Sequence, residues 1–328
     1  MSDKTEKTIS GKAADILNDT PANIICDRPA NMISDRPANI ICDRPANILY
    51  GKDVSEKIEN EISAKISNLI SQNITPTLAI LRIGENPADM AYENAVMKRA
   101  SKLGIKTKQF ALAADVSQSE VLVCIDQINM DDNIHGALIF RPFPKGLDDN
   151  LLRNRLAVSK DLDAITDEAL ALVFTGNAEN YPCTAMACVE LLKYYKIPLS
   201  GKIVLVLGRS LVIGKPVSML MQRENATVIM AHSKTSSEQL KKLSADSDVV
   251  IVATGKADTF GKEYAQAGQT IIDVGMNRRD DGRLVGDVSF DEVVDVVDAI
   301  TPVPKGVGSI TTACLLKQVV EAAEKQIK

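Results

Sequence analysis

From residue 48 onward, short apolar runs alternate with longer segments whose apolar residues recur at helical spacing. The run TLAILRIG (77–84) is followed by ADMAYENAVMKRASKLG (88–104), which closes with a glycine typical of a helix C-terminus. The same alternation returns with KIVLVLG (202–208) and KPVSMLMQREN (215–225). Strands that alternate with helices predict parallel sheets. We therefore expect an α/β fold of two domains, each a mostly parallel sheet with helices.

The composition is that of a soluble globular protein and argues against several other classes. A chain of 328 residues suggests about two domains, and its net charge of -5 without a basic block argues against nucleic acid as a partner. No apolar run approaches the roughly 20 residues of a membrane span. The N-terminus MSDKTEKTISGK carries both signs of charge and has no apolar core of a secretory signal. We expect a cytoplasmic protein with no membrane partner.

The cysteines and histidines give no metal pattern. Six cysteines occur without a C-x-x-C pair, and the chain has only two histidines. This argues against a disulfide framework and against a Cys/His zinc site. We expect a reduced chain with no metal, in which Cys183 packs in the interior and His135 has no chemical role.

Residues 21–52 contain an internal repeat of period eight: PANIICDR, PANMISDR, PANIICDR and PANILYGK. Each copy has a proline, which interrupts both helices and sheet pairing. We interpret the repeat as a tandem duplication that makes residues 1–47 a mobile tail. A docking segment for another protein is the alternative.

The stretch LVLGRSLVIGKP (205–216) raises the question of a phosphate site. It is one residue too long for a Walker loop and ends in proline, and it lacks the middle glycine of G-x-G-x-x-G. A strand nevertheless ends at Gly208 and a helix follows Gly214, which is the context of a dinucleotide turn. A plain structural turn remains the alternative at this point.

The end of the next strand favours one cofactor. An NAD-binding turn usually has an acid about 20 residues further on, bonded to the ribose hydroxyls. Here the strand ends in MAHSKT (230–235), which contains no acid. Arg209, Ser233 and Lys234 would instead attract a 2′-phosphate. The sequence therefore predicts NADP as the cofactor and a Rossmann-like C-terminal domain.

Several longer segments follow one another in an order that resembles a known family. They are IGENPADMAYENAVMKR, RPFP, KDLDA, PCTAMACVELL, VLGRSLVIGKPVSMLM, HSKT, VATGK, IIDVGMN, VGDV and ITPVPKGVGSIT. With these segments, the chain from about residue 48 to its end resembles the bifunctional methylenetetrahydrofolate dehydrogenase/cyclohydrolase (FolD) family. The resemblance implies NADP-dependent oxidation of 5,10-methylenetetrahydrofolate to the methenyl form, followed in most members by hydrolysis to 10-formyltetrahydrofolate.

The resemblance also implies a domain organisation. Family members are homodimers with a folate cleft between the domains, and their C-terminal helix folds back onto the first domain. We therefore expect a catalytic, folate-binding domain formed by residues 48–167 and 303–328, and an NADP-binding domain formed by residues 168–302.

Site residues follow from the family motifs. The implied cofactor contacts are Gly208, Arg209, Ser210, Ser233 and Met276. The implied folate contacts are Tyr92, Pro142, Asp163, Pro304 and Gly308. Tyr92 can stack on the folate ring and Asp163 can accept hydrogen bonds from the pterin N–H groups. The alternatives are a half-buried helix tyrosine, a solvated loop aspartate and a plain connector at 304–308.

Two positions depart from the family pattern at the residues that serve hydrolysis. The family has Tyr-x-x-x-Lys, but Val96 stands four residues after Tyr92, and Phe140 stands where the family has a glutamine bonded to that lysine. Lys98 lies roughly 240° around a helix from Tyr92, whereas the family lysine lies roughly 40° away. In a regular helix, Lys98 therefore lies on a different face from Tyr92. The catalytic candidates are Tyr92, Lys98 and Asp163, and the basic groups that could replace the lysine are Lys98, Arg141 and Lys305.

The two reactions have different requirements. Hydride transfer mainly requires that two ligands be held face to face, whereas hydrolysis requires a proton-transfer group and an activated water. We expect dehydrogenase activity to be present and cyclohydrolase activity to be weak or absent. A fully bifunctional enzyme is one alternative. A non-catalytic NADP-binding or scaffold protein that docks through its octapeptide repeat is another.

Overall fold

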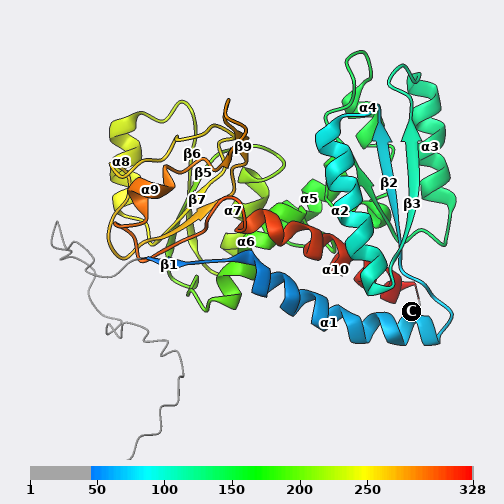
Figure 1. Ribbon diagram of the computed structural model, residues 1–328, viewed down its shortest axis with the longest axis horizontal. Helices are drawn as coiled ribbons and strands as arrows, with labels where there is room; N and C mark the ends of the chain where they lie inside the picture. Colours follow the sequence, from blue (N-terminus) through cyan, green and yellow to red (C-terminus); the bar gives the residue numbers. More distant parts are fainter. Residues whose placement is uncertain (1–45, 327–328) are drawn as a thin grey trace, which may run out of the picture. The chain divides into compact units, whose positions relative to one another are not determined.

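The computed structural model describes residues 46–326 (Figure 1). The interpretation of the octapeptide repeat as a mobile tail falls on residues outside this range, apart from the last repeat unit. Within the described range, no helix combines the length and the apolar character that a membrane crossing requires.

A three-stranded parallel sheet with strand order β3-β2-β4 forms the first half of the fold. The predicted alternation of strands and helices is confirmed, with the strand expected at 77–84 observed as β2 and the helix expected at 88–104 observed as α2. The elements are α1 (Gly51–Ser71), β2 (Thr77–Ile83), α2 (Pro87–Leu103), β3 (Lys106–Leu112), α3 (Gln118–Met130), β4 (Gly136–Ile139) and α4 (Asp149–Arg153). Gly104 ends α2 with φ +83°, the left-handed conformation for which glycine is suited.

A six-stranded parallel sheet with strand order β1-β11-β8-β7-β5-β6 forms the second half. Its strands are β1 (Asn47–Ile48), β5 (Ile203–Leu207), β6 (Thr227–Ala231), β7 (Val249–Val252), β8 (Thr270–Asp273) and β11 (Ala299–Ile300), and its helices include α7 (Gly214–Arg223), α8 (Ser237–Ala245) and α9 (Phe290–Val293). A hairpin of β9 (Asn277–Arg278) and β10 (Leu284–Val285) follows β8. The sheet thus takes its outer strand β1 from the residues that immediately precede α1.

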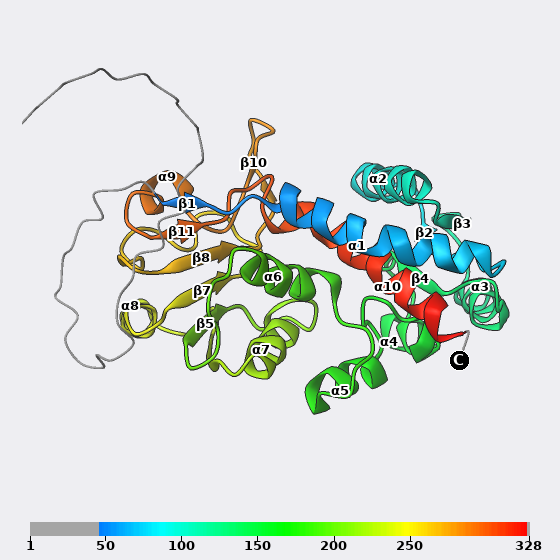
Figure 2. The same cartoon turned by 90° about the horizontal axis from the view of Figure 1, so that it is seen from below.

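The remaining α-helices of the described range are α5 (Asp167–Thr175), α6 (Cys183–Tyr194) and α10 (Thr311–Lys325). α10 lies beside α1 in both views (Figures 1 and 2) and contacts β2 and β4 as well as α6. α10 therefore packs on elements of the first half of the chain.

Each central strand is buried on both faces, as expected for parallel sheets. On β2, Leu78 and Ile80 face a core that contains α1 and α10, whereas Ala79 and Leu81 face α3. β5 alternates in the same way, and Val204 shares the core of Ile80. One continuous core therefore lies against a face of both sheets.

A buried ion pair fixes α2 to the first sheet. Arg82 at the end of β2 donates from Nε to Glu93 Oε2 at 2.7 Å, and the two side chains are only 10% and 4% exposed. Gln109 on β3 donates to the second carboxylate oxygen at 2.8 Å. Because Glu93 is the neighbour of Tyr92, this pair sets the register of the helix that carries Tyr92.

Removal of the Glu93 carboxylate should be strongly destabilising. Glu93→Ala leaves Arg82 buried without its charge partner, which we expect to cost about 3 kcal/mol or more. Urea-induced unfolding measures the change. The matched control is Glu61→Ala, which breaks an exposed pair of Lys57 and Glu61 on α1 and should cost less than about 1 kcal/mol. Equal losses of stability for the two variants would contradict this account.

Candidate active site

The carboxyl edge of the six-stranded sheet carries the loops in which a ligand is expected. β5 lies between β6 and β7, so the chain passes to opposite sides of β5 in succession. In open parallel sheets, ligands bind beyond the carboxyl ends of the strands at such a switch point. The loops after β5, β6, β7 and β8 therefore form the candidate cofactor site.

The two glycines of the turn after β5 pack directly against backbone. Gly208 has φ +140°, and a Cβ at this position would overlap the carbonyl oxygen of Ala253 in the loop after β7. A Cβ on Gly214 would overlap the carbonyl oxygen of Gly208. Glycine is required at both positions, and the turn leads directly into the N-terminus of α7. This close backbone approach fits the pyrophosphate of a dinucleotide.

The polar residues expected around a 2′-phosphate lie on two adjacent loops. Arg209 and Ser210 follow β5, Ser233 and Lys234 follow β6, and all four residues are exposed. Ser210 also holds the turn, because its Oγ accepts a hydrogen bond from the N–H of Ile213 at 3.1 Å. Since β5 and β6 are paired neighbours, these side chains extend from the same edge of the sheet.

Two buried aspartates hold the adjoining loops, and the sequence analysis did not identify them. Asp287 accepts hydrogen bonds from the N–H groups of Thr254 and Gly255 after β7, at 2.6 and 2.8 Å. Asp273 at the end of β8 accepts from the N–H groups of Gly275 and Asp287 at 3.0 and 2.9 Å. Burial raises the pKa of Asp273 to about 7, and the neighbouring Asp287 adds to the rise. The pair thus fixes the loop that leads to Met276.

The turn between β11 and α10 touches the loop after β8. A Cβ on Gly308 would lie 3.1 Å from the Met276 methyl group, so these two predicted contact residues are neighbours. Pro304 is exposed at the start of the turn. Lys305 follows with φ +86°, and its carbonyl oxygen accepts a hydrogen bond from the N–H of Gly51 at 2.8 Å. This turn ties the start of α1 to the edge of the cofactor site.

Tyr92 lies at the centre of the predicted substrate site. Its ring meets Phe140 edge to face, with the ring centres 6.0 Å apart. Burial raises the pKa of Tyr92 to about 12, and Cys183 and Asp163 add to the rise, while hydrogen bonds with Thr312 and Thr311 oppose it. Both threonines begin α10, directly after the turn that touches Met276. The substrate and cofactor residues are therefore linked through this one turn.

Asp163 lies in the same group. Its Oδ1 accepts a hydrogen bond from the backbone N–H of Cys183 at the start of α6, at 2.7 Å. Burial raises the pKa of Asp163, whereas the hydrogen bond from Cys183 and the charge of Arg141 lower it. Cys183 is buried, and its thiol pKa is raised well above the ordinary value by burial. These features fit an interior thiol that packs beside the site.

The position of the family lysine lies inside the core. Val96 is fully buried in the core shared by the two sheets. Lys98 is exposed and lines a groove with residues of α1 such as Lys52 and Glu59, and the lining of this groove does not include Tyr92. The structure therefore does not bring Lys98 to the predicted substrate group.

Two further expectations can be placed. Pro142 is exposed just after Arg141, on the loop that leaves β4. His135 is buried, and its Nδ1 accepts a hydrogen bond from the N–H of Thr77 at 3.1 Å.

Comparison with protein families gives two matches that together span most of the described residues. Residues 49–163 match the catalytic domain of tetrahydrofolate dehydrogenase/cyclohydrolase, and residues 182–327 match its NAD(P)-binding domain. This chain belongs to the tetrahydrofolate dehydrogenase/cyclohydrolase family. The NAD(P)-binding match contains the turn after β5, the aspartate pair and the turn at 304–308.

Individual family members resemble the chain over most of its length. The Bifunctional protein FolD of Clostridium botulinum (strain Langeland) is 44% identical over 255 residues, which are 77% of this chain and 90% of that protein. The crystal structure of the bifunctional enzyme FolD from Campylobacter jejuni has a TM-score of 0.83 and 34% identity, and the match covers 86% of this chain and 99% of that one. The Trypanosoma brucei family member, solved in complex with NADP cofactor and inhibitor, has a TM-score of 0.82 and 28% identity, with coverage of 87% and 99%.

A side chain at Gly208 should disturb the cofactor site. In Gly208→Ala the methyl group would displace the loop after β7, so we expect the predicted cofactor NADP to bind about tenfold more weakly or worse. Isothermal titration calorimetry measures the dissociation constant.

The matched control for this variant is Gly201→Ala. Gly201 also has a positive φ, +73°, but a Cβ there meets no atom within 4 Å. This variant should lose about 1 kcal/mol of stability from backbone strain and bind NADP as the wild type does. Unchanged NADP affinity in Gly208→Ala would contradict the assignment of the turn.

Proposed function

We propose that the chain is an NADP-dependent methylenetetrahydrofolate dehydrogenase that oxidises 5,10-methylenetetrahydrofolate to the methenyl form in one-carbon metabolism. The observation that carries the proposal is the link between the two ligand sites. Gly308 lies beside Met276 on the cofactor side, and Thr311 and Thr312, which follow it, are near enough to Tyr92 on the substrate side to lower its pKa. Two ligands on either side of this turn would be held next to each other, as hydride transfer requires.

The residues present fit NADP. The turn after β5 has the close backbone approach that a pyrophosphate needs, and Arg209, Ser233 and Lys234 supply positive charge and donors for the 2′-phosphate. NADP, when bound, supplies the hydride acceptor. Asp163 accepts hydrogen bonds from the pterin edge, and the ring of Tyr92 packs on the folate. Pro142, Pro304 and Gly308 line the substrate site.

The hydrolysis step is weak or absent in this proposal. Val96 and Phe140 put apolar side chains where the family pattern has a lysine and a glutamine. Tyr92, with a pKa of about 12, keeps its proton near neutral pH. Val96 and Phe140 therefore replace the pair of polar side chains that the family pattern uses to move a proton during hydrolysis of the methenyl bridge.

The fully bifunctional enzyme is the second candidate. It is favoured by the names of the relatives, since the Clostridium botulinum protein is called bifunctional. We further propose a cytoplasmic homodimer, a folate-binding domain of residues 48–167 and 303–328, and an NADP-binding domain of residues 168–302. A docking role for the octapeptide repeat stays a hypothesis for the residues outside the described range.

The proposal predicts that oxidation and hydrolysis are uncoupled. When the protein is mixed with methylenetetrahydrofolate and NADP, NADPH and methenyltetrahydrofolate should appear in equal amounts, and NAD should be a poorer acceptor. The methenyl form should accumulate, because Val96 and Phe140 replace the side chains that serve its hydrolysis in the family pattern. Absorbance spectroscopy follows the formation of both products.

Two other outcomes identify the alternatives. NADPH that forms without accumulation of methenyltetrahydrofolate would support the bifunctional enzyme. NADP binding without NADPH formation would contradict the dehydrogenase proposal and support a non-catalytic protein. Deletion of residues 1–45 serves as a control in each assay, because all the proposed site residues lie outside this segment.

A further inference from the structure

The Asp163 carboxylate lies on a short segment, residues 161–166, that belongs to no helix or named strand and leads into α5. Backbone N–H and C=O groups in such a segment are not paired by regular secondary structure, so side chains have to supply many of their partners. The position of Asp163 therefore depends on which side chains hold this segment and from which elements they come.

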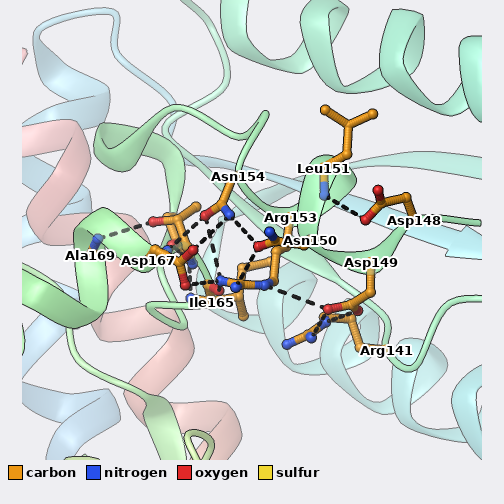
Figure 3. A network of polar contacts seen from close by, with 12 residues as sticks. Arg141, Asp148, Asp149, Asn150, Leu151, Arg153, Asn154, Ile165, Asp167 and Ala169 are labelled. Atoms are coloured by element: carbon orange, nitrogen blue, oxygen red, sulfur yellow. Dashed lines mark hydrogen bonds and ion pairs between the residues drawn. The ribbon is translucent and has the colours of Figure 1, made fainter.

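The end of the segment next to α5 is held by two charged side chains. Arg153 on α4 donates from Nη1 to the carbonyl oxygen of Ile165 at 3.0 Å and pairs with Asp167 at 2.6 Å (Figure 3). Asp161 accepts a hydrogen bond from the N–H of Ile165 at 3.0 Å. These contacts hold the residues that follow Asp163, so the residue before it depends on a separate anchor.

Gln318 on α10 supplies that anchor. Its side chain is only 1% exposed, and its Nε2 donates to the carbonyl oxygen of Leu162 at 2.6 Å. The same Nε2 donates to the carbonyl oxygen of Tyr181 at 3.1 Å, and Oε1 accepts from the N–H of Tyr181 at 2.6 Å. An amide has two donor hydrogens and one acceptor oxygen, so these three bonds determine its orientation. Gln318 therefore joins the residue that precedes Asp163 to the segment that leads into α6.

The two segments that Gln318 joins also meet at Asp163. The N–H of Cys183, at the start of α6, donates to Asp163 Oδ1 at 2.7 Å. The Cys183 sulfur lies 3.4 Å from Gln318 Nε2 and 3.8 Å from the carbonyl oxygen of Leu162. The contacts thus close a ring, and a buried network of this kind restricts the motion of its members. A change at Gln318 alters the separation of Leu162 and Tyr181, and with it the direction of the carboxylate.

We propose that Gln318 is a positioning residue of the substrate site, which orients the Asp163 carboxylate toward the N–H groups of the folate. It acts through its backbone contacts at Leu162 and Tyr181 and not through contact with the ligand. This inference rests on the proposed function, since it takes Asp163 as the residue that binds the folate. Gln318 lies outside the segments by which the chain resembles its family, so it adds the middle of α10 to the site.

Gln318→Met tests the proposal in the full-length protein. Methionine has nearly the length and volume of glutamine but cannot donate a hydrogen bond, so the carbonyl oxygen of Leu162 loses its partner. Isothermal titration calorimetry measures the dissociation constants of tetrahydrofolate and of NADP. We expect tetrahydrofolate to bind about tenfold more weakly, which is the effect of losing one well-oriented hydrogen bond to the ligand. NADP affinity should be unchanged, because Gln318 acts on the substrate side of the site.

A second buried glutamine gives a matched control. Gln269, directly before β8, is fully buried. Its Oε1 accepts from the N–H of Gln266 at 2.7 Å, and its Nε2 donates to the carbonyl oxygens of Ser244 and Ser247 at 2.5 and 3.1 Å. Because it precedes β8, it lies at the edge of the sheet opposite to the cofactor loops. Gln269→Met should therefore lose similar stability in thermal melting but bind both ligands as the wild type does.

A double-mutant cycle shows whether Gln318 acts through Asp163. Asp163→Ala removes the carboxylate, so it should itself weaken the binding of tetrahydrofolate. If Gln318 orients that carboxylate, adding Gln318→Met to Asp163→Ala should weaken binding further by less than about twofold. Independent effects would instead multiply, and the double variant would lose a further factor of about ten. A multiplied loss would overturn the proposal.

Two results with the single variants would also overturn it. One is folded Gln318→Met protein that binds tetrahydrofolate as tightly as the wild type, and the other is an equal loss of affinity in Gln269→Met. If Gln318→Met does not fold, Gln318→Asn takes its place, because its amide is one methylene shorter and cannot reach both segments. This variant should bind tetrahydrofolate about threefold more weakly, and wild-type affinity would contradict the role of Gln318.

The proposed function is tested separately in the wild type. Protein that binds tetrahydrofolate but forms no NADPH from methylenetetrahydrofolate and NADP would contradict the dehydrogenase, while the comparison of the variants still decides the role of Gln318. Wild-type protein that does not bind tetrahydrofolate would overturn both proposals.

Discussion

The packing of α10 against both halves of the fold is the constraint on which the rest of the structure depends. Leu316 on this helix belongs to one core that also contains Ile80 of the first sheet and Val204 of the second. The amide of Gln318 adds a buried hydrogen bond, from Nε2 to the carbonyl oxygen of Leu162 at 2.6 Å. Protein interiors are packed as densely as organic crystals, so a core of this kind holds its elements at fixed separations. The ends of the strands, from which the site loops extend, are therefore held at fixed positions.

The candidate site uses the N-terminus of the same helix. Thr312 is near enough to Tyr92 to lower its pKa, and Gly308 in the turn before it lies beside Met276, so one short segment adjoins both the proposed substrate side and the proposed cofactor side. The two positions that depart from the family motif, Val96 and Phe140, also belong to the packing around α10. Val96 is a member of the core that anchors α10, and Phe140 packs beside that core. The two positions that would serve hydrolysis therefore contribute to packing in this chain, while the groups that would bind the two ligands remain in place.

The sequence predicts the main elements because their signals are local. Apolar runs, helical periodicity and a glycine such as Gly104 mark strands, helices and their ends without any knowledge of the rest of the chain. Lys98 also lies where its offset from Tyr92 places it, since α2 is a regular helix. The two-residue strands β1 and β11 carry no periodic pattern, and their pairing joins residues from opposite ends of the described range. The hydrogen bonds of Gln318 could not be predicted either, because a polar residue within a helix does not indicate its partners. The family motif identified Phe140 as a departure, but its contact with Tyr92 required the structure.

We propose that this chain keeps the ligand-binding parts of the family site but lacks the lysine and the glutamine that serve hydrolysis in the family pattern. The direct test supplies methenyltetrahydrofolate to the purified protein without NADP and follows its decay spectroscopically at several protein concentrations. We predict a decay rate equal to that in buffer and independent of protein concentration. A rate that rises in proportion to the protein would contradict it, and would mean that a proton-transfer group acts from a position other than that of Val96 and Phe140.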